Sequence, residues 1–172
     1  MVTLVHVADS RDAAAILRSG LALPKRRLRD LESESRKHGV FAMPVIDDFL
    51  LTHQWVRELA RRGYRSAVGV YFRLPDDELV WAGRYNGEKR LCSAAAAAAE
   101  LRSQRLLGYE VIVPRAVRAA EVNAVRPLPA VGWRFHPEAK GQRPFCPCKF
   151  CTRGEIKARR LRSRLDPDGS YV

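Results

Sequence analysis

The sequence predicts a mixed α+β protein, because apolar runs with strand character alternate along the chain with segments of helical spacing. Residues 67–72 and 109–113 are rich in β-branched and aromatic side chains, which is typical of buried strands. The apolar fraction of 47% over 172 residues suffices for one hydrophobic core. We therefore expect one α+β domain with a short C-terminal appendage.

The expected strands are short runs bounded by proline, glycine or aspartate. Pro44 and Pro114 close two of them, because proline cannot donate a hydrogen bond to a continuing ladder. The run over 67–72 is followed by a turn at 75–77, and residues 80–82 are expected to pair beside it. Strands are expected over residues 3–7, 39–44, 67–72, 80–82, 109–113, 122–125 and 131–135.

The expected helices begin at residues that cap an N-terminus and end at glycine. The segment over 47–63 is the most amphipathic, since its apolar residues recur every three to four positions. The N-caps are Asp9 or Ser10, Asp47 and Ser93, and the matching stops are Gly20, Gly63 and Gly108. Helices are thus expected over 13–17, 47–63 and 93–107, with a basic, helical or semi-ordered segment over 25–37.

Net charge is the most unusual property of the composition. Lys and Arg number 31 against 19 Asp and Glu, which leaves a formal net charge of +12. A field of this sign concentrates polyanions, so DNA or RNA is the expected partner; a composition bias that serves only solubility is the alternative. The sequence shows no run long and apolar enough for a membrane helix and no secretory signal pattern, which predicts a cytoplasmic protein with no membrane partner.

Three cysteines, Cys146, Cys148 and Cys151, lie within six positions near the C-terminus. Thiolates at this spacing converge on one metal ion when the backbone turns, and soft thiolates select zinc or an iron–sulfur cluster. We expect structural zinc, with His136 as the nearest candidate for a fourth ligand and Cys92 as a more distant one. The alternative is a loop of three unligated cysteines.

From position 136 onward the chain carries nine Lys or Arg against four Asp or Glu and few aliphatic residues. We therefore divide the chain into an α+β domain over 1–135 and a zinc-binding basic extension over 136–172, with a helix expected over 155–165. Basic side chains at this density suit contacts with phosphates, which contribute affinity but little sequence selectivity. A solvated helix is the alternative. The expected nucleic-acid contacts are Arg153, Lys157, Arg159, Arg160 and Arg162.

Two polar residues interrupt apolar strand segments of the first domain: His6 and Glu110. His6 precedes a helix that contains the stretch ILRSGL at 16–21, and Phe41 lies in the strand segment between the two polar residues. Over residues 3–128 this series resembles the ADP-ribosyltransferase-like fold, in particular the branch with the RNA 2′-phosphotransferases and the DNA-modifying ADP-ribosyltransferase toxins. The resemblance implies small split antiparallel sheets with flanking helices.

The same resemblance implies a cleft between the two small sheets that binds NAD or an ADP-ribosylated intermediate. His6 would hydrogen-bond a ribose, and Phe41 would pack against nicotinamide. Glu110 would orient the ribose and stabilise the oxocarbenium-like centre that forms as nicotinamide leaves. Arginines would hold the pyrophosphate, and the candidates are Arg18, Arg26, Arg27 and Arg84.

The resemblance therefore predicts an NAD-dependent ADP-ribosyltransferase-like protein that acts on or near nucleic acid. Two other functions fit the residues. One is a non-enzymatic, zinc-containing nucleic-acid-binding protein, and the other is a basic interaction module for an acidic protein partner. NAD turnover separates the enzyme from both, and salt-dependent binding to nucleic acid separates the two non-enzymatic functions.

Overall fold

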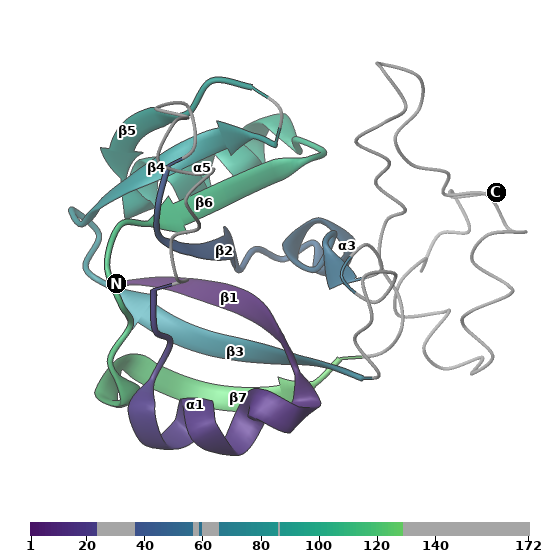
Figure 1. Cartoon of the computed structure of the whole chain (residues 1–172). Helices are drawn as coiled ribbons and strands as arrows, with labels where there is room; N and C mark the ends of the chain where they lie inside the picture. Colours follow the sequence, from purple (N-terminus) through teal and green to yellow (C-terminus); the bar gives the residue numbers. More distant parts are fainter. Residues whose placement is uncertain (24–36, 57–58, 60–65, 86, 129–172) are drawn as a thin grey trace, which may run out of the picture.

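The computed structural model describes residues 1–23, 37–56, 59, 66–85 and 87–128 (Figure 1). Several expectations from the sequence lie outside these residues and stay predictions. They are most of the basic segment over 25–37, the end of the helix at Gly63, the strand over 131–135, and the whole extension over 136–172.

The described part of the chain is a mixed α+β structure built on a seven-stranded antiparallel sheet in the order β5-β4-β6-β2-β1-β3-β7. This confirms the α+β class. The strands are β1 (Val2–Asp9), β2 (Val40–Pro44), β3 (Ala67–Leu74), β4 (Leu79–Arg84), β5 (Arg90–Ser93), β6 (Tyr109–Val113) and β7 (Val122–Pro127). The helices are α1 (Ala13–Ser19), α3 (Phe49–Thr52) and α5 (Ala94–Gln104), with 3-10 turns η1 (Ser10–Asp12) and η2 (Ala119–Glu121).

The sheet narrows sharply between β1 and β2. Their ladder is formed by the pairs Leu4–Pro44 and Val5–Met43, whereas β1 pairs with β3 from Val2 to Asp9. In Figure 1, β4, β5 and β6 form an upper half, β1, β3 and β7 form a lower half, and β2 lies between them. The structure thus has one continuous sheet with a narrow join where separate small sheets were expected.

Helix α1 ends as the sequence predicts, at Gly20 with φ 78°. A β-carbon on Gly20 would lie 2.0 Å from the carbonyl oxygen of Val117, so the close approach of the two chain segments requires glycine. Leu21 then pairs with Val117 as an isolated bridge, and Ile16 and Leu21 join the main core. The tight stop at Gly20 therefore holds α1 against the lower half of the sheet.

Helix α5 packs on the upper half through its alanines and Leu101, which is fully buried. Ser93 caps its N-terminus by accepting a hydrogen bond from the amide of Ala96, as the sequence predicts. The expected end near Leu107 is wrong. The helix stops at Gln104 because Arg105 adopts the left-handed conformation, φ 48°, and its guanidinium pairs with Asp48.

Where one helix was expected over 47–63, the described residues show the short helix α3 and then a turn, after which Val56 and Leu59 are again helical. Asp48 caps α3 by accepting from the amide of Leu51, and the regular helix ends at Thr52. Residues 53–55 form a turn, because His53 and Gln54 hydrogen-bond to partners far away in the sequence. The amphipathic pattern located the buried segment but could not reveal this break.

The pairing expected for residues 80–82 is also wrong. β4 pairs with β5 and β6 rather than with β3, through the pairs Trp81–Leu91 and Trp81–Ile112. The sequence analysis did not identify β5, which is four residues long and follows a short turn. Among the described residues, no helix has the length and apolar character to cross a membrane.

Candidate functional site

The three residues on which the resemblance rests occupy neighbouring strands. His6 lies on β1, Phe41 on β2 and Glu110 on β6, and these strands are adjacent in the order β6-β2-β1. Residues more than a hundred positions apart in the sequence are therefore brought to one region, at the join between the two halves of the sheet.

His6 lies where the β1–β2 ladder stops and the strands separate. Its Nδ1 is 2.7 Å from the backbone carbonyl oxygen of Phe41. A carbonyl oxygen only accepts, so Nδ1 carries the proton and the neutral ring presents Nε2 as an acceptor. Burial lowers the pKa of His6, although the bond to Phe41 opposes this, and the neutral form is therefore favoured at physiological pH.

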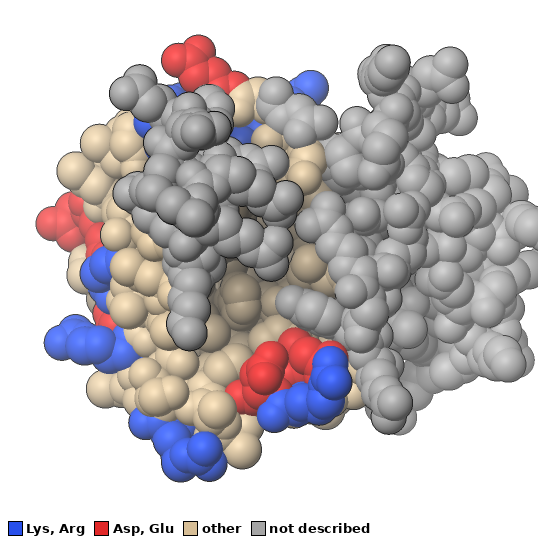
Figure 2. All heavy atoms as spheres, in the orientation of Figure 1, with Lys and Arg blue, Asp and Glu red and all other residues tan. Residues whose placement is uncertain are grey.

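A cavity of about 350 Å³ lies between β1, α1 and the residues that follow α1. Asp12, Ala15, Ile16 and Ser19 line it at positions i, i+3, i+4 and i+7, so one face of α1 forms a wall. His6 provides the polar group of the opposite wall. In Figure 2 the described surface is recessed near its centre, where β1 runs in Figure 1. The cavity is lined by His6, Ala8, Asp12, Ala15, Ile16, Ser19, Gly20, Leu21 and Ala22.

Four residues of the 16–21 stretch singled out in the sequence line this cavity: Ile16, Ser19, Gly20 and Leu21. An imidazole acceptor and the carboxylate of Asp12 in the lining of one cavity suit a ligand with hydroxyl donors, such as a ribose. The Ser19 hydroxyl donates to the carbonyl oxygen of Ala15 at 2.8 Å and keeps its acceptor capacity.

Glu110 is the buried carboxylate of β6. Its Oε1 lies 3.0 Å from Nζ of Lys89, and both side chains are nearly inaccessible, at 11% and 7% exposure. Burial raises the pKa of Glu110, and the bond and charge of Lys89 oppose that rise. A buried carboxylate with a single charged partner is typical of functional sites, and it also occurs in structural ion pairs of protein cores.

The turn after α3 holds the start of β6 in place. The side-chain carbonyl of Gln54 accepts the amide proton of Gly108 at 2.6 Å, and Nε1 of Trp55 donates to the carbonyl oxygen of Tyr109 at 2.8 Å. The Trp55 ring also lies 5.4 Å from the ring of Tyr85, the residue that follows β4. The sequence analysis did not identify these supports; the polar pair His53 and Gln54 within an apolar helical pattern was the available signal.

Phe41 and Glu110 lie on the same face of the sheet, whereas His6 comes from the alternate position. Phe41 of β2 pairs with Ile112 of β6, and Ile112 shares a face with Glu110 because the two are two positions apart in one strand. Tyr109, the neighbour of Glu110 in β6, lies on the other face, where its hydroxyl donates to the carbonyl oxygen of Ala97 in α5. The β1–β2 register aligns Val5, not His6, with the Phe41 face. Glu110 is not among the residues that line the cavity beside His6, so the structure brings their strands together without placing both side chains in one cavity wall.

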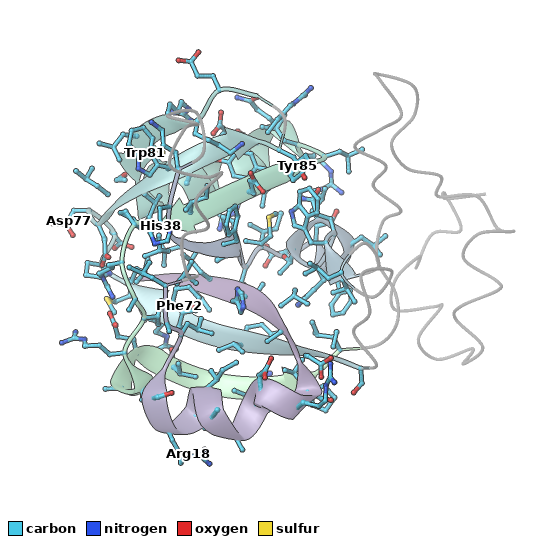
Figure 3. All side chains as sticks on the ribbon, viewed as in Figure 1. Arg18, His38, Phe72, Asp77, Trp81 and Tyr85 are labelled. Atoms are coloured by element: carbon cyan, nitrogen blue, oxygen red, sulfur yellow. The ribbon has the colours of Figure 1, made fainter. Side chains whose placement is uncertain are left out.

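The two described arginines expected at a pyrophosphate do not line this cavity either. Arg18 projects from the outer side of α1 (Figure 3), away from the face formed by Asp12, Ala15 and Ser19. Arg84 is exposed and lies opposite Tyr109 in the β4–β6 ladder. Because Tyr109 and Glu110 are successive residues of one strand, the side chain of Arg84 belongs to the sheet face opposite Glu110. Arg26 and Arg27 lie outside the described residues.

Of the metal-ligand candidates, the structure describes Cys92 alone. This residue lies on β5, half-buried, opposite Val80. Burial raises the pKa of its thiol. Within the described ranges, no group of three or more His, Cys, Asp or Glu side chains could hold a metal. The other proposed ligands and the basic contacts lie outside those ranges: Cys146, Cys148, Cys151, His136, Arg153, Lys157, Arg159, Arg160 and Arg162.

Comparison of the chain with protein-family models, with curated proteins and with solved structures found no match in any of the three.

Proposed function

We propose that the protein is an ADP-ribosyltransferase-like enzyme that uses NAD and acts on or near nucleic acid. The observation that carries this proposal is the state of His6. Its Nδ1 proton is engaged by the Phe41 carbonyl, so Nε2 is an acceptor beside a cavity walled by residues of the 16–21 stretch. An acceptor in that position is what recognition of a ribose hydroxyl requires.

The position of Phe41 supports the second part of the proposal. Its side chain is 46% exposed on β2, between the buried residues Val40 and Ala42. The exposed ring offers a flat surface for nicotinamide on the same sheet face as Glu110. Phe41 has no hydroxyl group, so its contribution is packing alone.

Glu110 supplies the charge that the reaction needs. When the bond between nicotinamide and ribose breaks, positive charge develops on the ribose, and a nearby carboxylate stabilises it. Because His6 projects from the sheet face opposite Phe41 and Glu110 and does not share a cavity with Glu110, the proposal requires the dinucleotide to pass from the His6 cavity, where β1 and β2 separate, to the face that carries Glu110. Residues at both ends of that path are therefore needed for the test.

The experiment is to incubate the full chain with NAD and measure nicotinamide by chromatography. We expect Glu110→Gln to reduce release by about 10²-fold or more, the range for removal of one transition-state charge interaction. We expect His6→Asn to raise the KM for NAD by roughly tenfold, the effect of one lost hydrogen bond to a polar ligand. Glu88→Gln and His38→Asn are matched controls and should leave both constants unchanged. Absence of both NAD binding and nicotinamide release at millimolar NAD would refute the proposal.

The nucleic-acid part of the proposal rests on charge. The extension over 136–172 holds nine Lys or Arg against four Asp or Glu and so contributes +5 to the net charge of +12. We expect single-stranded RNA or DNA to bind with an affinity that falls steeply as salt rises. The double variant Arg159→Ala/Arg160→Ala should weaken binding, and Arg102→Ala, an exposed arginine of α5, is the control. Binding to an acidic protein but to neither nucleic acid would favour the interaction module instead.

A further inference from the structure

Lys89 is a buried ammonium group surrounded by oxygen atoms. Besides its ion pair with Glu110, its Nζ lies within hydrogen-bonding distance of the carbonyl oxygens of Tyr85, at 3.1 Å, and Gly87, at 3.4 Å, and of that of Arg84. The three carbonyls belong to the last residue of β4 and to the turn that follows it. An ammonium group has three protons, so the turn by itself can satisfy Nζ and hold it in place whether or not Glu110 is charged.

Gly83 leaves the space through which Lys89 reaches Glu110. Gly83 is the residue of β4 directly opposite Glu110 on β6. A β-carbon on Gly83 would lie 3.3 Å from Cδ of Lys89 and 2.6 Å from the carbonyl oxygen of Glu88. The stem of Lys89 therefore passes over a strand position without a side chain, and a larger residue there would displace the turn.

We propose that Lys89 is the positioning residue of Glu110: the β4–β5 turn fixes its ammonium group as a built-in counter-ion that orients one carboxylate oxygen and keeps the carboxylate charged. The inference rests on the proposed function, in which Glu110 faces the developing positive charge. It adds the residue that keeps Glu110 ionised and oriented for this role.

The electrostatics of the surroundings support this role. Burial raises the pKa of Glu110, and Lys89 is the charged group that opposes this effect. Two other titratable groups near the upper strands have different partners: Lys37 lies 4.1 Å over the Trp81 ring, and the Tyr109 hydroxyl donates to Glu100. Figure 3 shows Trp81 and Tyr85 on this half of the molecule.

The sign of the pH effect follows. Without Lys89, the pKa of Glu110 rises further, so the carboxyl group stays protonated to a higher pH and the site loses its charge. Activity of Lys89→Met should fall on the acid side of the profile and recover as pH rises. A residue with only a structural role would lower activity without moving the profile.

The test is a pH titration of the full chain labelled with ¹³C at the glutamate carboxyl carbons, with Glu110→Gln used to assign the Glu110 signal. We expect Lys89→Met to raise the Glu110 midpoint by at least about one pH unit, a tenfold change in proton affinity. Lys89→Arg should stay close to wild type, and Lys37→Met, which removes a cation from the same half of the sheet, should not move the midpoint.

A midpoint in Lys89→Met within about 0.3 pH units of wild type would overturn the proposal, because a cation 3.0 Å from the carboxylate must affect its proton affinity. If Lys89→Met does not fold, the ¹⁵N chemical shift of the Lys89 Nζ in the wild type is measured against pH in its place. That shift should change at the same midpoint as the Glu110 carboxyl signal. A Nζ shift that does not change at this midpoint would refute the ionic link between Lys89 and Glu110.

Nicotinamide release by the same variants separates this inference from the proposed function. A shifted midpoint with no release from any variant, wild type included, would refute the enzymatic function and leave the ionic link established. Release with one pH profile shared by wild type and Lys89→Met would overturn the positioning role and leave the enzymatic function standing.

Discussion

Replacing Gln54 by alanine is expected to destabilise the protein through the start of β6. Gln54 is 3% exposed, and its side chain accepts from the amide of Gly108 and donates to the carbonyl oxygens of Leu51 at 3.1 Å and Leu106 at 3.4 Å. The truncation leaves the Gly108 amide buried without its acceptor, at a cost of about 1–3 kcal/mol, and loses about 1 kcal/mol for the bond to Leu51. We expect the free energy of unfolding to fall by about 2–4 kcal/mol.

Urea unfolding followed by tryptophan fluorescence and far-UV circular dichroism measures this loss. Gln104→Ala is the matched control, since Gln104 is exposed at the end of α5, and it should change the free energy of unfolding by less than about 0.5 kcal/mol. Hydrogen exchange of the Glu110 amide should accelerate in Gln54→Ala alone, because Gly108 directly precedes β6. A loss below about 1 kcal/mol would refute the reasoning, since it would mean that the Gly108 amide finds another acceptor.

Three further predictions concern stability and metal content. Two hydrogen bonds from Arg115 lower the pKa of Glu121 from an ordinary 4.5 to about 2. Glu121→Gln should therefore lower the free energy of unfolding by about 1–2 kcal/mol above pH 5, a value reduced by the partial exposure of Arg115. Because Glu121 of the wild type becomes protonated as pH falls from 4.5 toward 2, the difference between the two proteins should shrink over that range. An equal difference in urea unfolding at pH 7 and pH 3.5 would contradict it. Leu101→Ala should destabilise by about 2–5 kcal/mol and Leu79→Ala, 55% exposed, by less than 1 kcal/mol, because only the first leaves a cavity. Elemental analysis of the purified chain should find one zinc ion that Cys148→Ser or a chelator removes; a chain without metal would exclude the zinc site.

Local chemistry in the sequence determined where most elements lie. Short apolar runs bounded by turn residues predicted β1, β2, β3 and β6 within one or two positions, because strand character in such a run depends on its own residues. Ser93 and Gly20 marked helix ends for the same reason, since a cap bonds to amides within its own turn and a left-handed stop favours glycine. His6 and Glu110 could likewise be selected from the sequence, because a polar group in an apolar strand stands out without any knowledge of its partners. Phe41 is apolar, and it was selected only through the resemblance.

Tertiary structure alone decided which of these elements meet. A strand pattern shows which face is buried but not which strand lies beside it, so the pairing of β4 with β6 could not be foreseen. The breaks after Thr52 and Gln104 depend on bonds from His53, Gln54 and Arg105 to groups 18 to 57 positions away, which no helical period encodes. Lys89 belongs with these: its side chain reaches Glu110 only because β4 lies against β6, and the free energy of a buried charge depends on neighbours that the fold supplies.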